Sequence, residues 1–209
     1  MVRIFNEVIS SPEQLRELIG FPSVRAASKD QSRLDRHCIA LIEKSPFVLI
    51  ASSDAAGNLD ISPKGDPPGF VRLLDEQTLA IPDRKGNRRL DTFTNILVNP
   101  KVALFFMVPG YRETLRVTGM ARIVSDTALR ESMAVGASVP DLALVVDVET
   151  AFFHCAKCVI RSGLWETEKW PAIDSIPSLG AILKDHAHAP DAVEEIEAQI
   201  RKSYAENLY

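Results

Sequence analysis

The sequence predicts a mainly β protein, a small antiparallel β-barrel wrapped by helices, and three observations predict it. Six or seven short apolar or alternating segments follow one another, and tight turns separate them. The most apolar stretch, VALFFMV at 102–108, is typical of a buried central strand. Helical patterns stand at both ends of the chain rather than between strands, which argues against a parallel α/β sheet.

Length and composition indicate one folded domain. The chain has 209 residues, of which 46% are hydrophobic and 25% charged, as in ordinary globular proteins. We divide it into N-terminal helices at 1–46, a barrel core at 47–165 and a helical extension at 166–209. No internal repeat or low-complexity linker interrupts these parts.

Charge and hydropathy exclude several classes of protein. The net charge of −4 disfavours broad binding to nucleic acid or to an anionic membrane. The longest apolar run is far shorter than the roughly 20 residues of a membrane-spanning helix. Residues 1–15 lack the apolar core of a signal peptide, and three cysteines make no disulfide framework. We therefore expect a cytoplasmic protein with neither nucleic acid nor membrane as partner.

The first helices and hairpins follow from capping and turn residues. Ser11-Pro12-Glu13-Gln14 is a helix start, Gly20 ends that helix, and a second helix is expected at 32–44. Segments 47–51 and 59–62 flank the turn 54–58 and predict a β-hairpin. Segments 70–74 and 78–81 predict a second strand pair.

Further elements complete the predicted core. We expect a short surface helix at 88–98, then the central strand 102–108 paired antiparallel with 113–124. A short helix at 127–134 and a last strand at 142–148 follow. Apolar residues at helical spacing predict an amphipathic helix within 189–209.

One sequence cluster combines His154, Cys155 and Cys158. With His186 and His188 it would make a zinc site, and as a CxxC pair it would make a redox dithiol. The apolar run 151–153 just before it favours a third interpretation, in which the two thiols are shielded and structural. No GxGxxG, P-loop, HExxH or GxSxG motif is present.

A second cluster carries four cations in six residues, Arg84, Lys85, Arg88 and Arg89, around Gly86 and just before a predicted helix. Guanidinium groups, flexible backbone N–H groups and a helix N-terminus are what a phosphate dianion requires. The alternative is a solvated basic loop. The nearby stretch 62–69, rich in Pro and Gly, offers Lys64 and backbone donors to a planar ligand, or else an edge-strand bulge.

In this order, these segments resemble the pyridoxamine 5′-phosphate oxidase-like proteins, which bind FMN in a split β-barrel. The blocks that carry the resemblance are 62–123 (SPKGDPP to GMARI) and 154–165 (HCAKCVIRSGLW). The resemblance implies a six-stranded, Greek-key-like antiparallel split barrel and a homodimer, with FMN in a groove between the two barrels. It is strongest for a subgroup of probable FMN-dependent enzymes.

The same resemblance implies the cofactor-binding residues. Asp60, Ile61, Ser62 and Lys64 would flank the flavin ring and ribityl chain, and Pro82 and Asp83 would meet ribityl and phosphate. Arg84, Lys85, Asn87 and Arg88 would form the phosphate turn. Thr114, Leu115 and Arg116 would contact the flavin, and Arg161, Ser162 and Trp165 would close the site from the partner chain.

Two departures from the family pattern shape the expected function. The usual Ser-Arg-Lys phosphate motif is not at its place, and the ending that holds pyridoxal phosphate is missing, which argues against vitamin B6 oxidation. We therefore expect an FMN-dependent oxidoreductase acting on an unidentified small molecule, with NAD(P)H as a candidate reductant. Lys64 or Arg116 would stabilise charge on the reduced ring, and no dedicated catalytic acid or base is identified.

Two other classes of protein stay open at this point. The first is a non-catalytic flavin- or haem-binding module for sensing or storage, with His37 or His154 as the haem ligand. The second is a zinc protein built on Cys155 and Cys158.

Overall fold

The computed structural model describes residues 3–209. Met1 and Val2, which belong to the segment 1–15 discussed above, lie outside the described residues. Residues up to Asp30 form one compact unit and Gln31–Tyr209 another. The first unit holds α1 (Pro12–Ile19) and α2 (Val24–Ala27). The Ser11 side chain accepts a hydrogen bond from the Gln14 amide, and Gly20 ends α1 with a φ of 79°, so this predicted helix is confirmed.

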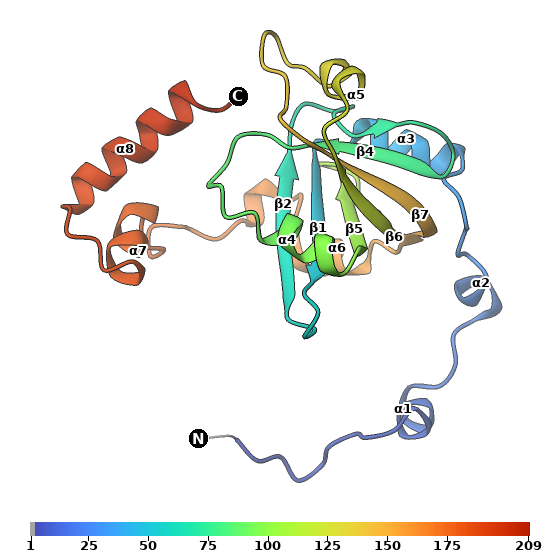
Figure 1. Ribbon diagram of the computed structural model, residues 1–209. Coiled ribbons are helices and arrows are strands. Elements are labelled where there is room, and N and C mark those ends of the chain that lie inside the picture. Colours follow the sequence, from blue (N-terminus) through green and yellow to red (C-terminus); the bar gives the residue numbers. More distant parts are fainter. Residues whose placement is uncertain (1–2) are drawn as a thin grey trace. The chain divides into compact units, whose positions relative to one another are not determined.

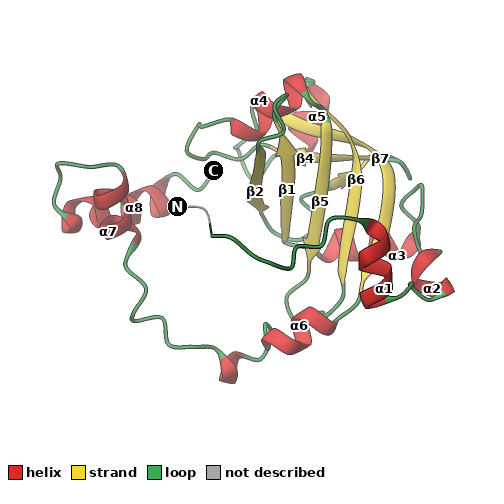
Figure 2. Cartoon of the chain, turned by 90° about the horizontal axis from the view of Figure 1, so that it is seen from below, coloured by secondary structure: helices red, strands yellow, loops and turns green. Residues whose placement is uncertain are grey.

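The second unit is built on one antiparallel sheet (Figures 1 and 2). Its order is β2-β1-β5-β6-β7-β4-β3. The strands are β1 (Phe47–Ser53), β2 (Leu59–Gly65), β3 (Arg72–Leu73), β4 (Thr78–Pro82), β5 (Lys101–Met107), β6 (Thr114–Val124) and β7 (Ala143–His154). The seventh strand beyond the six implied by the resemblance is β3, which has two residues. β2 and β3 are its two edges, so the sheet does not close.

The predicted hairpins are confirmed by the strand register. Phe47 pairs with Gly65 and Ser53 with Leu59 in the first hairpin, and β3 pairs with β4 in the second. β5 pairs antiparallel with β6, as the alternation of 113–124 predicts. In β5 every second residue is buried, and Leu104 and Phe106 are fully so.

The β6–β7 pairing contains an irregularity that the sequence pattern does not predict. Thr118 pairs with Thr150 but Gly119 pairs with Val148, so Glu149 is left over in the register as a β-bulge. β7 reaches His154, six residues beyond the predicted end at 148. Its second half pairs with Thr114–Thr118 of β6, a long-range contact that local periodicity does not reveal.

Two helices cover the sheet, and the spacing of apolar residues predicts the buried face of the first. α3 (Arg36–Lys44) buries Cys38, Leu41 and Ile42. It begins at Arg36 rather than at 32, because Asp35 is its N-cap. The Asp35 carboxylate accepts hydrogen bonds from the backbone amides of His37 and Cys38. α4 (Asp91–Val98) begins at 91 rather than 88, and it is not the surface helix that the polar sequence predicts, because it contacts β1, β2 and β6 and buries Phe93 and Ile96.

The remaining helices follow the last strands. They are α5 (Thr127–Ser132), α6 (Lys157–Ser162), η1 (Thr167–Lys169), α7 (Leu179–His186) and α8 (Val193–Glu206). α7 packs on α8, where the Glu197 carboxylate accepts from the Gly180 amide at 2.6 Å. Across residues 3–209, none of the helices combines the length and apolarity needed to cross a bilayer.

Candidate functional site

A cavity of about 1110 Å³ opens beside the edge strand β2. This volume is slightly above the roughly 300–1,000 Å³ usual for small-molecule sites. Four parts of the chain form its walls: β2, the turn from β4 into α4, the loop after α5, and the segment 203–209. Nine of the sixteen predicted cofactor residues line it, namely Asp60, Ile61, Ser62, Lys64, Asp83, Arg84, Lys85, Asn87 and Arg88.

The turn 83–90 has an unusual backbone where it borders the cavity. Arg88 and Leu90 have φ values of 59° and 62°, in the left-handed region that residues other than glycine rarely adopt. Such conformations concentrate at ligand sites, where the surrounding structure holds them in place. Leu90 is also the N-cap of α4, and its side chain cannot accept a hydrogen bond. The first backbone N–H groups of α4 can therefore donate to another acceptor.

The four cations of this turn differ in what already holds them. The Arg84 Nε donates to Asp66 at 2.6 Å, and the Arg89 Nε donates to Asp91 at 2.7 Å. The Lys85 ammonium donates to the main-chain oxygen of Tyr209 at 2.6 Å. The Arg88 guanidinium forms no hydrogen bond or ion pair with any residue that the structure describes. It is therefore the guanidinium most available to an anionic ligand.

A second polar group of the cavity is centred on Asp83. Its carboxylate lies 3.6 Å from the Lys64 ammonium, and about a quarter of each side chain is exposed. Burial raises the pKa of Asp83 from its usual value even though Lys64 acts in the opposite direction. The Lys64 ammonium also lies 5.8 Å from the centre of the Phe93 ring. Asp83 and Lys64 therefore form a polar wall that a ligand with hydroxyl groups can satisfy.

Asp60 is fixed in the same wall. Its carboxylate accepts a hydrogen bond from Thr92 Oγ1 at 2.8 Å, which connects β2 to the first turn of α4. Because α4 also buries Phe93 and Ile96 in the core, β2 and the turn 83–90 are held together by packing as well as by this bond.

The other seven predicted residues do not line this cavity. Pro82 ends β4 immediately before Asp83. Thr114 and Leu115 are buried in β6, and Arg116 lies over the Phe152 ring at 5.2 Å. Near α6, Trp165 donates to the Tyr111 carbonyl at 2.8 Å and Ser162 donates to the Val159 carbonyl, while Arg161 is exposed. Within a single chain the expected site is thus divided into two groups.

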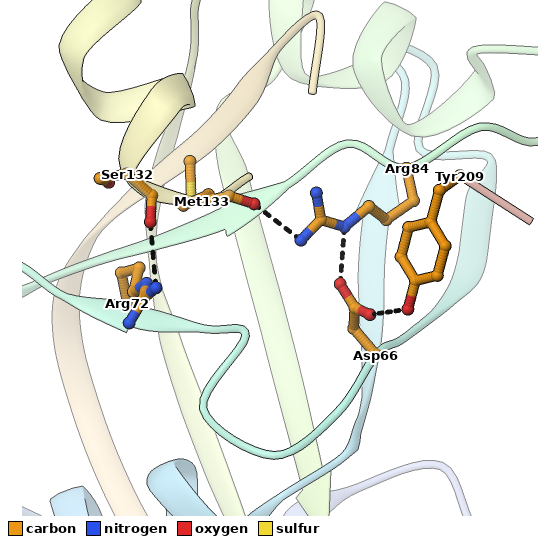
Figure 3. Close-up of polar contacts among 6 residues, drawn as sticks. All are labelled: Asp66, Arg72, Arg84, Ser132, Met133 and Tyr209. Atoms are coloured by element: carbon orange, nitrogen blue, oxygen red, sulfur yellow. Dashed lines mark hydrogen bonds and ion pairs between the residues drawn. The ribbon is translucent and has the colours of Figure 1, made fainter. Parts of the chain in front are cut away.

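The structure also shows residues that the sequence analysis missed. Asp66, the loop 138–141 and the segment 203–209 belong to the cavity or to its polar contacts. Figure 3 shows Tyr209 beside Asp66 and Arg84. No local pattern signals this contact, because Tyr209 and Asp66 are 143 positions apart.

The expected shielding of the two thiols is wrong, because Cys155 and Cys158 are both exposed. Cys155 follows the last residue of β7, and Cys158 lies in α6, whose buried residue is Val159. Of the apolar run before them, Ala151 is buried, but Phe152 and Phe153 are only partly buried. Among residues 3–209, no three His, Cys, Asp or Glu side chains come together as a metal site would require. Neither His37 nor His154 lines the cavity.

Comparisons with known proteins place these observations in a family. A family model described as pyridoxamine 5′-phosphate oxidase matches residues 34–155, more than half of the chain. The comparison with curated proteins finds no match.

The solved structures that resemble this chain include the following three. Group A Streptococcus HupZ is 26% identical over 57% of this chain and 93% of its own, with a TM-score of 0.47. General Stress Protein 26 from Bacillus anthracis is 13% identical over 55% and 88%, with a TM-score of 0.45. An FMN-binding protein from Syntrophomonas wolfei is 10% identical over 56% and 88%, with a TM-score of 0.42.

Proposed function

Because the chain belongs to the pyridoxamine 5′-phosphate oxidase family, we propose that it binds FMN in this cavity and is an FMN-dependent oxidoreductase of a small molecule. The observation that carries the proposal is the phosphate turn. There an unengaged Arg88 and the amides of α4, which no side chain caps, border one cavity. Lys85 adds a second positive charge. A phosphate dianion satisfies all three kinds of donor at once.

The rest of the cavity fits the remaining parts of FMN. Lys64 and Asp83 supply a donor and an acceptor for the ribityl hydroxyls, and residues 60–64 of β2 supply backbone along one wall. When bound, the flavin supplies the hydride or electron transfer, and the protein binds and orients it and tunes the local charge. The Lys64 ammonium, held in place by Asp83, would stabilise negative charge on the ring. In this proposal NAD(P)H is a candidate reductant and the protein acts in the cytoplasm.

The division of the expected site residues into two groups supports a homodimer. Arg116, Arg161 and Trp165 lie outside the cavity of their own chain, so a second copy would bring them to it. Apolar side chains are also exposed where a partner would pack. In the edge strand β2 and the adjacent α4 these are Leu59, Ile61, Leu97 and Val98, each at least 60% exposed.

A dimer of this kind makes a direct prediction for solution mass. We expect an obligate dimer whose interface is well over the roughly 1,600 Å² of a standard complex, and hence a dimer at micromolar concentration. Light scattering of the purified protein measures the mass. A monomer that still carries flavin would contradict both the dimer and a site completed by the partner.

The cofactor itself is tested by spectroscopy of the purified protein. We expect the visible absorbance of a flavin, and its loss when NADH or NADPH is added without air. A Soret band instead would indicate haem and overturn the proposal. Flavin that is bound but never turned over with any acceptor would leave a flavin-binding module without enzymatic activity.

The phosphate turn yields a sharper prediction. Arg88→Ala should weaken FMN binding by about 1.5–3 kcal/mol, because it removes a charge-assisted hydrogen bond to the phosphate. Riboflavin, which has no phosphate, should bind the wild-type protein weakly and lose little further affinity in the variant. Fluorescence titration measures both ligands.

Arg89→Ala is the matched control for this experiment. It removes the same charge one position away, but the Arg89 guanidinium is already bound to Asp91. Its effect on FMN should be much smaller. Equal losses for the two variants, or equal losses for FMN and riboflavin in Arg88→Ala, would show that Arg88 does not bind phosphate.

A further inference from the structure

The segment 203–209, which we call the closing segment, is attached to the cavity by a chain of hydrogen bonds (Figure 3). The Tyr209 hydroxyl donates to one carboxylate oxygen of Asp66 at 2.6 Å, and the other oxygen accepts from the Arg84 Nε at 2.6 Å. Arg84 Nη2 donates onward to the Met133 carbonyl at 2.9 Å. Asp66 has only 2% of its side chain exposed. The Tyr209 hydroxyl thus adds a hydrogen bond to the buried ion pair between Arg84 and Asp66, the residue that follows β2.

Two more contacts hold Tyr209 in the same place. The Arg84 guanidinium carbon lies 5.8 Å from the centre of the Tyr209 ring, and the Lys85 ammonium donates to the Tyr209 main-chain oxygen. The hydrogen bond to Asp66, together with burial, raises the pKa of Tyr209 above its usual value. The phenol therefore keeps its proton, and the bond to Asp66, throughout the neutral pH range.

The rest of the closing segment contributes little to its own attachment. Tyr204 and Leu208 line the cavity but are 64% and 63% exposed, and the one buried residue of α8 is Ile196. A segment with so few buried apolar contacts opens at a low free-energy cost. Its attachment to the cavity therefore depends mainly on Tyr209.

The closing segment walls the cavity without filling it. The volume of about 1110 Å³ is present while Tyr209 is bound to Asp66, so a ligand and the attached segment are compatible. A contact that encloses a site and can open is suited to control how fast a ligand enters and leaves.

We propose that the closing segment is a gate over the cavity and that Tyr209 is the positioning residue that keeps it closed. The attachment is independent of which ligand the cavity takes. The statement that FMN is the ligand whose exchange it controls rests on the proposed function. Tyr209 acts through Asp66 and Arg84 rather than by contact with reacting atoms.

The attachment is tested without any ligand, by hydrogen–deuterium exchange of residues 203–209. Tyr209→Phe removes the bond to Asp66 and keeps the ring on Arg84, and should speed exchange of the segment by about tenfold or more. Tyr204→Phe is the matched control, because Tyr204 lines the same cavity but its hydroxyl forms no hydrogen bond within the described chain. It should exchange as the wild type does. Unchanged exchange in Tyr209→Phe would overturn the proposal.

The gate is tested by stopped-flow binding and release of FMN. If the segment must open for exchange, Tyr209→Phe should raise the association and dissociation rate constants by a similar factor and leave Kd nearly unchanged. A purely structural role would not speed association. Faster dissociation with unchanged association would show that Tyr209 contacts the ligand and would overturn the gate.

The two experiments separate the two proposals. A wild-type protein that fails to bind FMN would refute the proposed function, and hydrogen exchange would still decide whether Tyr209 closes the segment. Normal FMN binding with rate constants unaltered in Tyr209→Phe would refute the gate alone.

Discussion

Asp66→Ala is expected to lower the free energy of unfolding by about 3–5 kcal/mol, because it leaves a buried guanidinium without its counter-charge. Only 16% of the Arg84 side chain is exposed, and its Nε bond to Asp66 is 2.6 Å long. Nη1 of Arg84 is already buried without a hydrogen-bond partner among the described residues. The variant would therefore leave two nitrogens of one buried cation unsatisfied. Chemical denaturation measures the loss.

Two further variants separate this effect from the loss of any ion pair. Asp91→Ala removes the partner of Arg89, but both side chains of that pair are about half exposed or more, so the cost should stay below about 1 kcal/mol. Asp66→Ala combined with Arg84→Met removes the buried charge together with its partner and should recover much of the stability. A double variant as unstable as Asp66→Ala would show that the buried charge is not the cause.

Gly119→Ala is the second substitution with a large expected effect, about 3 kcal/mol of destabilisation. A Cβ at this position would lie 2.1 Å from the Asp147 carbonyl oxygen and 2.9 Å from its carbon. Both atoms belong to the backbone of β7, so the strand pair itself would have to shift. Thermal unfolding measures the change.

Gly65→Ala is the matched control for a glycine in the same sheet. There the nearest atoms are the Pro46 carbonyl oxygen at 3.4 Å and the Phe47 side chain at 3.7 Å, which is ordinary contact. A similarly small change at both positions would show that the two strands can separate at the bulge without cost.

The close approach at Gly119 also positions one half of the candidate site. It lies at the register shift, so Thr114 and Arg116 pair with the second half of β7 and the residues beyond Gly119 with the first. A straight register would turn the side chains of one half to the opposite face. Small size at position 119 therefore determines the face of the sheet on which Arg116 lies.

Local sequence patterns determined most of the sheet and one part of the site. Apolar runs suffice to predict β1 and β5, and alternation with turn residues suffices for β2 and β6, because these signals lie in neighbouring residues of one strand or hairpin. The basic turn was also visible, since Arg84, Lys85, Arg88 and Arg89 stand together with Gly86. The family resemblance over 62–123 added the FMN hypothesis to this pattern, and the matching family model confirms the family.

Only the tertiary structure decided which of these cations is available. Arg84 and Arg88 look alike in the sequence, but Asp66 and Tyr209 occupy the first and leave the second unengaged. The pairing between β6 and β7 ends at His154, and this sets both the length of β7 and the exposure of Cys155, the next residue. Hydrophobic periodicity indicates which face of its own helix or strand a residue lies on. Hydrogen bonding and burial arise from residues up to 143 positions away, which meet only when the chain has folded.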